Sequence, residues 1–226
     1  MNLGSRAAAA RAGCALPADA TLYYSAYTIT PRHKSEEMNG LRDQLLTPLR
    51  TGTLLLTPLG EPHRAPLRAA CAADPAIWPI YATSYAPPQF DASFDALLAN
   101  PGRLPFAVFD GDALVGMTAY LRLDPGAQTL EIGNSYLVPI ARGTGLNTAM
   151  KRLMIAHAFA CGLRRIEFRI DTRNARSQAA VRKLGAVHEG TLRAERITWT
   201  GHVRDTALFA LLREDWEAAA PRSPVP

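Results

Sequence analysis

The chain has 226 residues, of which 48% are hydrophobic and 20% are charged, and this composition excludes a protein that is disordered throughout. No apolar run approaches the roughly 18 to 20 residues of a membrane span, and the three cysteines form no CxxC pair and accompany no histidine cluster, so we expect neither a membrane partner, a metal nor a disulfide framework. Because no disulfide framework is expected, we expect a protein of the reducing cytoplasm. The net charge of +5 is scattered along the chain, so we do not expect it to bind nucleic acid.

The two ends of the chain differ from its middle. Residues 1–17 are rich in alanine and lack the continuous apolar core of a secretion signal. We expect residues 1–50 to be a poorly ordered extension, residues 51–219 to form one domain, and residues 220–226 to be a frayed tail. Met38 leaves open whether residues 1–37 belong to the native protein.

The first half of the domain predicts strands and two helices. The expected elements are a strand at 53–57, helices at 61–73 and 91–100, and a hairpin of strands 105–109 and 113–122. Asp91 is a candidate cap for the second helix. The aromatic loop 78–90 between the helices is either a surface loop over the core or one wall of a substrate pocket.

The second half predicts a crossover followed by a hairpin. The expected elements are a strand at 129–138, a helix at 144–161, a strand at 165–171, a helix at 174–184 and a hairpin of strands 187–199 and 203–212. Asn174 is the expected cap of the last helix, and Gly185 is its stop. This order predicts an α/β fold with a mixed, mostly antiparallel sheet of six or seven strands and helices on both faces.

The loop between Pro139 and the helix at 144–161 has the properties of a phosphate-binding loop. It reads Arg142-Gly143-Thr144-Gly145-Leu146-Asn147. Two glycines allow a tight bend, and the first N–H groups of the helix have no partners within it. The loop is therefore a candidate cradle for a pyrophosphate.

Several segments in this order resemble the GNAT superfamily of N-acetyltransferases, in particular its ribosomal-protein and small-amine branch (RimJ/RimL type). They are Glu131-Ile132-Gly133, Val138-Pro139, the loop 142–147, Asn174 to Ser177, Leu184-Gly185-Ala186, Glu189-Gly190 to Arg193, and Arg204-Asp205. The resemblance extends over residues 53–216. One departure is Asn147, where the family pattern R/Q-x-x-G-x-G/A has a small residue.

The resemblance implies the GNAT fold and acetyl-CoA as the co-substrate, with no metal. The pyrophosphate would bind the N–H groups from Gly143 to Thr148, and the pantetheine arm would lie along the strand end like an added strand. The implied cofactor-binding residues are Leu137, Val138, Arg142, Gly143, Thr144, Gly145, Leu146, Asn147, Thr148, Asn174 and Ser177. A positive charge at Arg142 would help offset the phosphates.

Acetyl transfer to an amine requires a base, an oxyanion donor and a proton for the CoA sulfur. Glu131 is the candidate base, because alternation places it with Gly133, Ser135 and Leu137 on one face of its strand. The alternative for Glu131 is a carboxylate paired with a structural arginine. The N–H of Leu137 or Val138 is the candidate oxyanion donor.

Ser177 and Asn174 complete the candidate site. Ser177 lies one turn beyond Asn174 and is a candidate to protonate the sulfur or orient a water, while Asn174 would hold the pantetheine amide. The alternative is that both serve only the start of their helix. Arg193, Arg204 and Asp205 form either structural ion pairs or a contact to an acidic substrate group.

These observations predict an N-acetyltransferase that moves an acetyl group from acetyl-CoA to a primary amine by direct attack in a ternary complex. The acceptor, either a protein N-terminus or a small molecule, stays open, as does a homodimer. Two alternatives remain: a catalytically silent acyl-CoA-binding module, and a dinucleotide-binding Rossmann-type enzyme, in which Asp171 would bind a ribose. The lone His157, His188 and Cys161 are interpreted as packing or surface residues.

Overall fold

The computed structural model describes residues 31–219, so the predicted tail and the first thirty residues of the predicted extension lie outside the described part. The chain divides into two units, Met1–Glu36 and Glu37–Pro226. Of the first unit, only the start of helix α1 is described. The second unit holds the sheet, the remaining helices and the candidate site.

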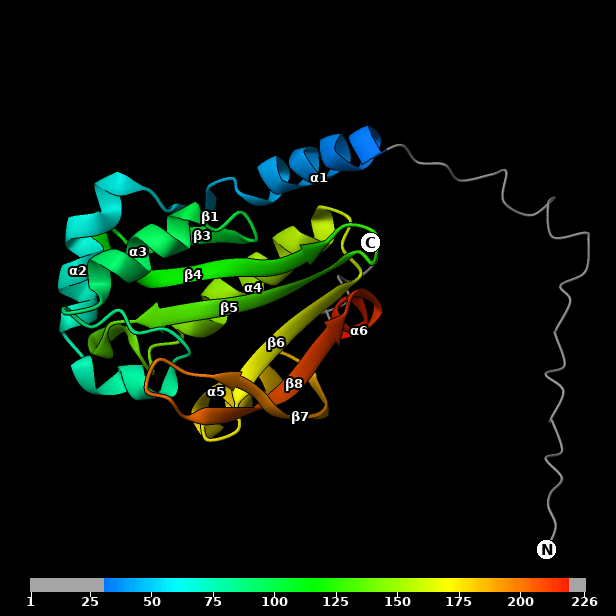
Figure 1. Ribbon diagram of the computed structural model, residues 1–226. Coiled ribbons are helices and arrows are strands. Elements are labelled where there is room, and N and C mark those ends of the chain that lie inside the picture. Colours follow the sequence, from blue (N-terminus) through cyan, green and yellow to red (C-terminus); the bar gives the residue numbers. More distant parts are fainter. Residues whose placement is uncertain (1–30, 220–226) are drawn as a thin grey trace, which may run out of the picture. The chain divides into compact units, whose positions relative to one another are not determined.

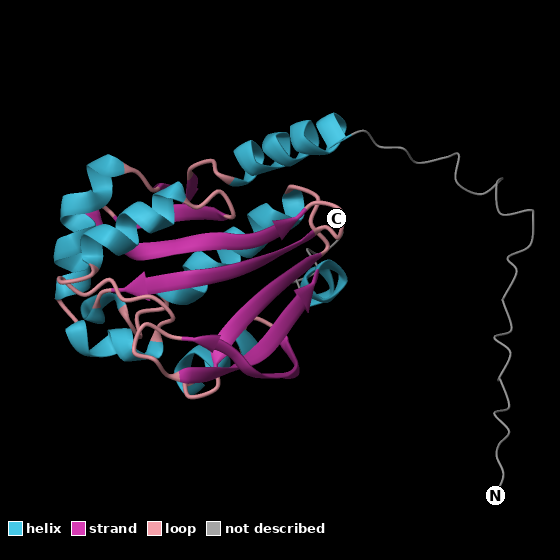
Figure 2. Ribbon diagram, viewed as in Figure 1, coloured by secondary structure: helices cyan, strands magenta, loops and turns pink. Residues whose placement is uncertain are grey.

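The helices and strands follow the predicted order. The helices are α1 (Pro31–Leu45), α2 (Arg64–Ala72), α3 (Phe90–Ala99), α4 (Leu146–Ala160), α5 (Ala175–Arg182) and α6 (Arg213–Ala219), with 3-10 turns η2 (Glu61–His63), η3 (Pro75–Ile80) and η4 (Pro139–Ala141). The strands are β1 (Leu49–Thr51), β2 (Leu54–Pro58), β3 (Arg103–Asp110), β4 (Ala113–Asp124), β5 (Thr129–Leu137), β6 (Arg165–Asp171), β7 (Val187–Ile197) and β8 (Val203–Leu212). Figure 2 shows the same elements by type.

Eight strands form one mixed sheet in the order β1-β2-β3-β4-β5-β6-β8-β7 (Figure 1). Every pair is antiparallel except β5 and β6, which α4 connects as a crossover. The predicted mixed, mostly antiparallel sheet is therefore confirmed, with β1 as an additional edge strand. Within residues 31–50, which the sequence assigned to the extension, the structure has α1 and the start of β1, and Leu45 and Leu49 are buried.

Each face of the sheet has its own hydrophobic core, as the predicted helices on both faces require. On one face, α2, α3 and η3 pack against Ala107, Met117 and Tyr136. On the other face, α4 packs Met150, Met154 and Ile155 against the sheet, and Figure 1 shows α4 passing behind β4 and β5. We call these the α3 face and the α4 face. Between residues 31 and 219, no helix is long and apolar enough to cross a membrane.

The predicted cap of α3 was wrong. Gln89 occupies the N-cap position without a capping hydrogen bond from its side chain, and Asp91 lies inside the first turn. The helix begins earlier because the ring of Phe90 is fully buried in the core. The Asp91 carboxylate instead accepts a hydrogen bond from Arg64 Nη1 at 3.1 Å.

A β-bulge divides strand β5. Ala119 pairs with Gly133 and Met117 pairs with Tyr136, so one residue of β4 (Thr118) opposes two of β5 (Asn134 and Ser135). Asn134 takes the extra position with φ 48°. The side chains before and after the bulge therefore change faces relative to simple alternation.

The two parallel strands separate soon after they meet. β5 and β6 pair only from Thr129 to Glu131 and from Arg165 to Glu167. Figure 1 shows the two strands diverging toward the left of the view. The facing edges of both strands beyond this short pairing are not bonded to each other, and they flank an opening in the sheet.

Candidate active site

A cleft of about 650 Å³ occupies the opening between β5 and β6. It brings together most of the site residues predicted from the sequence: Glu131, Leu137, Arg142, Gly143, Gly145, Asn147, Thr148, Asn174 and Ser177. Val138, Thr144 and Leu146, which were also predicted, do not line it. The predicted residues thus come from three separate segments and meet at one place.

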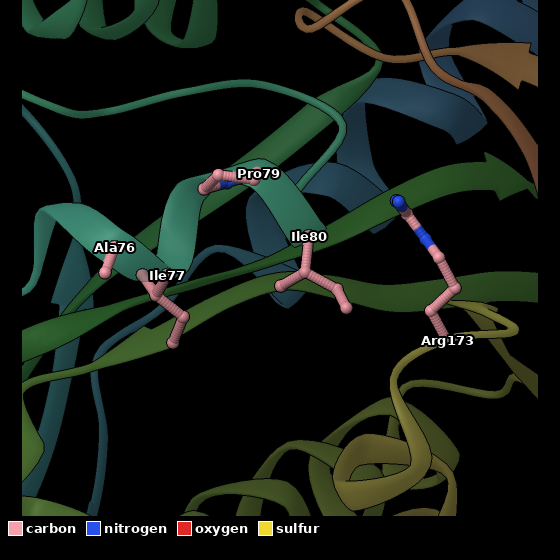
Figure 3. Close-up of a pocket in the computed structure, with 5 residues that line it drawn as sticks. All are labelled: Ala76, Ile77, Pro79, Ile80 and Arg173. Atoms are coloured by element: carbon pink, nitrogen blue, oxygen red, sulfur yellow. The ribbon is translucent and has the colours of Figure 1, made fainter.

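The aromatic loop 78–90 covers the core and also forms part of the wall of the cleft. Trp78 and Tyr85 are fully buried, whereas Tyr81, Ala82 and Thr83 line the cleft. A smaller hollow of about 300 Å³ lies between η3 and Arg173, as Figure 3 shows, with Ile77 and Ile80 on its apolar side. Ile80 lines both spaces, so the small hollow adjoins the cleft.

The loop 142–147 makes a tight turn at its two glycines. Gly143 and Gly145 have φ of 80° and 92°, which side chains disfavour, and a Cβ at either position would meet no atom within 4 Å. Thr144 Oγ1 donates to Ala141 O and accepts from Leu146 N, which fixes the turn. Among the described residues, no acceptor binds the N–H of Asn147 or Thr148. The α4 N-terminus therefore fits an anion such as a pyrophosphate.

Arg142 connects this loop to β5 and to the residue that precedes η3. Its Nε donates to Leu137 O at 2.8 Å, and its Nη1 pairs with the carboxylate of Asp74. Its guanidinium also lies 5.5 Å from the centre of the Tyr136 ring. Nη2 is buried without a hydrogen-bond partner among the described residues. The contact between Arg142 and Asp74 was not predicted from the sequence.

The two candidate oxyanion donors differ in availability. Val138 N–H donates to Val115 O at 2.8 Å and is therefore occupied. Hydrogen bonding alternates along an antiparallel pair, so the N–H of Leu137 points away from β4 toward the opening. Of the two, the geometry favours Leu137.

Asn174 and Ser177 line the cleft at the start of α5. Asn174 Oδ1 accepts from Ser177 N at 3.0 Å, which confirms the predicted cap. The amide nitrogen of Asn174 and the hydroxyl of Ser177 make no hydrogen bond with any described residue. Capping thus leaves both groups able to contact a ligand.

Glu131 is a buried carboxylate beside arginines. Its Oε2 lies 3.2 Å from Arg122 Nε and 4.0 Å from Arg169 Nε. Burial raises the pKa of Glu131 above its usual value, and the neighbouring arginines oppose this rise. Glu131 is thus paired with an arginine, as one interpretation of the sequence expected, and it also lines the cleft, as its alternative role as a base requires.

The expectation that Glu131, Gly133, Ser135 and Leu137 share one face was wrong, because the bulge at Asn134 interrupts alternation. Gly133 faces the same side as Glu131: a Cβ built on Gly133 would lie 2.9 Å from Glu131 Oε1. Ser135 instead points to the α4 face, where its hydroxyl lies 2.7 Å from Thr118 Oγ1. The cleft therefore passes through the sheet, with Glu131 on one side and the end of β5 on the other.

Sequence reasoning missed Lys151, which lies in the buried stripe of α4 between Met150 and Met154. Its amine donates to Ser135 Oγ at the α4 side of the cleft. Burial lowers the pKa of Lys151 to about 7, and Glu131 opposes this shift. A lysine within an apolar helical stripe was the available signal.

The lone residues interpreted as packing lie elsewhere. His157 Nε2 is 3.0 Å from Gln44 O, and Cys161 Sγ is 3.7 Å from the same imidazole nitrogen. The His188 ring packs against Phe209. None of the three lines the cleft. Among the described residues, no group of histidine, cysteine or acidic side chains has the arrangement of a metal site.

Comparisons with known proteins agree with this geometry. Residues 53–187 match the family model of the acetyltransferase (GNAT) domain. A GNAT-family protein from Chromobacterium violaceum ATCC 12472 is 30% identical with a TM-score of 0.69, over 76% of this chain and 94% of that one. A GCN5-related N-acetyltransferase from Brucella melitensis is 26% identical with a TM-score of 0.71, over 76% of this chain and 81% of the other.

A third similar structure carries a ligand related to CoA. It is RimJ of Mycobacterium smegmatis in complex with CoA-disulfide, which is 26% identical with a TM-score of 0.65, over 78% of this chain and 88% of RimJ. No curated protein matches the chain in sequence.

Proposed function

We propose that this chain, which belongs to the GNAT family of acetyltransferases, transfers an acetyl group from acetyl-CoA to a primary amine on a small molecule or a protein N-terminus. The observation that carries the proposal is the cleft between β5 and β6, with the donor-rich start of α4 at one side and a buried carboxylate at the other. Acetyl-CoA supplies the activated acyl group.

The chain's residues have distinct parts in binding the cofactor. The N–H groups of Asn147 and Thr148 would bind the pyrophosphate, and the unpaired edge of β5 would bind the pantetheine arm as an added strand. The Asn174 amide would bind a pantetheine carbonyl without losing its cap to Ser177 N. The Leu137 N–H would donate to the acetyl oxygen as charge develops there.

Glu131 is the proposed base, acting directly or through a water. The amine must lose a proton before its nitrogen can attack the thioester carbon. Glu131 takes this first proton. As the new C–N bond forms and the C–S bond breaks, the nitrogen loses a second proton, which passes through Ser177 or a water to the departing CoA sulfur. A raised pKa makes Glu131 a stronger base than an exposed glutamate.

The proposal is tested first by thermal unfolding with acetyl-CoA, CoA and NAD in separate samples. A ligand at about 100 times its dissociation constant stabilises a fold by roughly 2.7 kcal/mol. We expect a shift with both CoA species and none with NAD. A shift with NAD alone would instead support the dinucleotide-binding alternative, and no shift with CoA would refute the proposal.

A charge change at the start of α4 separates cofactor binding from folding. Thr148→Asp puts a carboxylate at a helix N-terminus, where it favours the helix but repels a phosphate. We expect unchanged or higher stability without ligand and a smaller shift with acetyl-CoA. The matched control is Thr51→Asp, which makes the same change on the exposed edge strand β1 and should keep the full shift.

The role of Glu131 is tested by Glu131→Gln, which keeps the side-chain size. We expect kcat/KM for amine acetylation to fall by about 10²- to 10⁴-fold. The thermal shift with acetyl-CoA should stay. An unchanged rate would make Glu131 a structural partner of Arg122 and Arg169, and CoA binding without any turnover would identify the silent module.

A further inference from the structure

Arg204 is an unusual arginine, because it is buried without a carboxylate partner. Its side chain comes from β8 and lines the cleft, and the residue is only 6% exposed. Among the described residues, no carboxylate oxygen lies close enough to its guanidinium, within 4.0 Å, to form an ion pair. A buried charge without a partner is costly, and an anionic ligand at Arg204 would offset this cost.

The hydrogen bonds of Arg204 are also incomplete. One Nη2–H donates to Arg169 O at 3.0 Å. Nε is buried and has no partner among the described residues, and Nη1 makes no hydrogen bond there either. Buried polar groups are nearly always satisfied, so these free donors indicate a missing acceptor. A guanidinium binds two oxygens of a carboxylate or phosphate side by side, which suits such an acceptor.

The neighbours of Arg204 add positive charge on the same side of the cleft. Arg169 and Arg196 also line it. Burial, followed by the charge of Arg196, lowers the pKa of Arg204, and Asp171, Glu195 and Glu131 oppose this shift. The nearby carboxylates have other partners: Glu195 lies 3.3 Å from Arg196 Nε, and Asp171 lies 2.7 Å from Arg173 Nη2. Like charges held this close favour an anion between them.

The position of this arginine group relative to Glu131 identifies the reactant that it would bind. Arg169 lies 4.0 Å from Glu131 Oε2, the proposed base. The phosphate cradle at Asn147 and Thr148 lies at the α4 side of the cleft, across the bulge from Glu131. An anion at Arg204 would therefore belong to the acceptor amine rather than to CoA.

We propose that the acceptor carries a carboxylate or a phosphate close to its amine, and that Arg204 binds this anion and places the amine beside Glu131. The inference rests on the proposed acetyl transfer and narrows its acceptor. It selects acidic amines and disfavours polyamines, whose second charge would face the arginines.

The test compares matched acceptors with and without an anionic group. The pairs are β-alanine and β-alaninamide, O-phosphoethanolamine and ethanolamine, and the peptide amides Ser-Glu-Ala and Ser-Gln-Ala. CoA release at saturating acetyl-CoA gives kcat/KM for each. We expect the anionic member to be favoured about tenfold or more, since hydrogen bonds to charged groups are among the stronger ones. The first two pairs distinguish carboxylate from phosphate, and the peptide pair reports on a protein acceptor.

Variants assign the preference to the residue. Arg204→Gln should lose the preference for the anionic members, while Arg204→Lys should keep part of it. Arg50→Gln is the control, because Arg50 is exposed on the edge strand β1 and does not line the cleft. The thermal shift with acetyl-CoA reports whether each variant still folds and binds the cofactor.

A binding measurement keeps the proposal falsifiable if turnover is slow. Thermal unfolding of the CoA-loaded protein should show stabilisation by β-alanine or O-phosphoethanolamine that Arg204→Gln lacks. Equal stabilisation by the charged and neutral members, or by neither, overturns the anion proposal. Turnover of neutral amines would then leave acetyl transfer intact, whereas loss of the acetyl-CoA shift in the parent protein would refute the proposed function itself.

Discussion

Gly133 provides the space that the Glu131 carboxylate occupies. A Cβ at this position would lie 2.9 Å from both Glu131 Oε1 and Leu121 Cδ1. Both contacts are ends of side chains, so the fold can adapt while the carboxylate moves. The residue thus positions the proposed base without touching a reactant.

We therefore expect Gly133→Ala to lower kcat/KM by about 10²-fold, since small misplacements of reacting groups have effects of this size. Steady-state acetylation kinetics measure the loss, and circular dichroism checks the fold. Gly126→Ala is the control, because its nearest contact, Asp124 Oδ1, is 3.4 Å away and outside the cleft. An unaffected rate would show that Glu131 does not need its present position.

Lys151 makes the stability of the protein depend on pH. Its pKa falls from 10.5 to about 7 on burial, so between these values the unfolded chain holds a proton that the folded chain does not. The contribution of Lys151 to the free energy of unfolding then rises with pH from about 7 to 10.5 and is lowest below 7, where the buried amine is charged.

Denaturant unfolding across this pH range measures the effect, and Lys151→Met should reduce the slope. The matched comparison is Lys183→Met, a substitution near the end of α5, where a lysine that is not buried should leave the slope unchanged. If the two variants have the same slope, the amine of Lys151 keeps its ordinary pKa.

At the scale of elements, the start of α5 combines two roles that substitution can separate. Asn174→Ala removes the cap to Ser177 N and should cost about 0.5–2 kcal/mol of stability. Asn174→Asp keeps a capping oxygen but removes the amide donor. We expect Asn174→Asp to keep the stability and to lose affinity for acetyl-CoA, measured by calorimetric titration. Equal affinity in this variant and the parent would restrict Asn174 to capping.

Local periodicity predicted the elements well, and it failed where pairing decides the geometry. β6 has the predicted bounds of Arg165 to Asp171, because its apolar residues alternate without interruption. The bulge at Asn134 was not predicted, because an extra residue in one strand is defined only by the register of its partner β4. This one residue changed the predicted environment of Ser135.

In the candidate site too, features that depend on neighbours in sequence were predicted, and features that depend on distant segments were not. The loop 142–147 and the Asn174 cap depend on neighbours in sequence, so their pattern was visible. The pairing of Arg142 with Asp74 and the isolation of Arg204 depend on segments far apart in the chain. The sequence therefore predicted the segments at one end of the cleft, where we propose that the cofactor binds, and did not predict the arginine group at the other end.

At the scale of the whole Glu37–Pro226 unit, backbone pairing and a hairpin contact join the two parts of the sheet on either side of the cleft, in addition to ion pairs such as that of Arg122 with Glu195. The short pairing of β5 with β6 joins them at one end. At the mouth, Trp199 near the tip of the β7–β8 hairpin donates its indole N–H to Trp78 O at 2.9 Å, and its backbone N–H donates to Ala82 O at 3.3 Å. Figure 1 shows this hairpin, in orange, beside the segment that follows η3.

Trp199→Phe removes the indole hydrogen bond while keeping an aromatic ring. We expect a loss of about 1 kcal/mol in stability and faster release of a bound reactant, since the mouth opens more easily. Denaturant unfolding and stopped-flow dissociation of CoA measure the two effects. Trp216→Phe on α6 serves as the control, because this ring packs against Arg152 away from the cleft. Equal release rates in both variants would exclude a role for the hairpin contact.

Because the cleft passes through the sheet, the proposed cofactor and acceptor sites open on different faces. Neither bound reactant then blocks the entrance of the other, so we expect no compulsory order of binding. Initial-rate patterns should show a random sequential scheme, in which CoA competes with acetyl-CoA but not with the amine. For the same reason, an inhibitor that occupies only the acceptor entrance should not compete with acetyl-CoA, and raising the acetyl-CoA concentration should not relieve its inhibition.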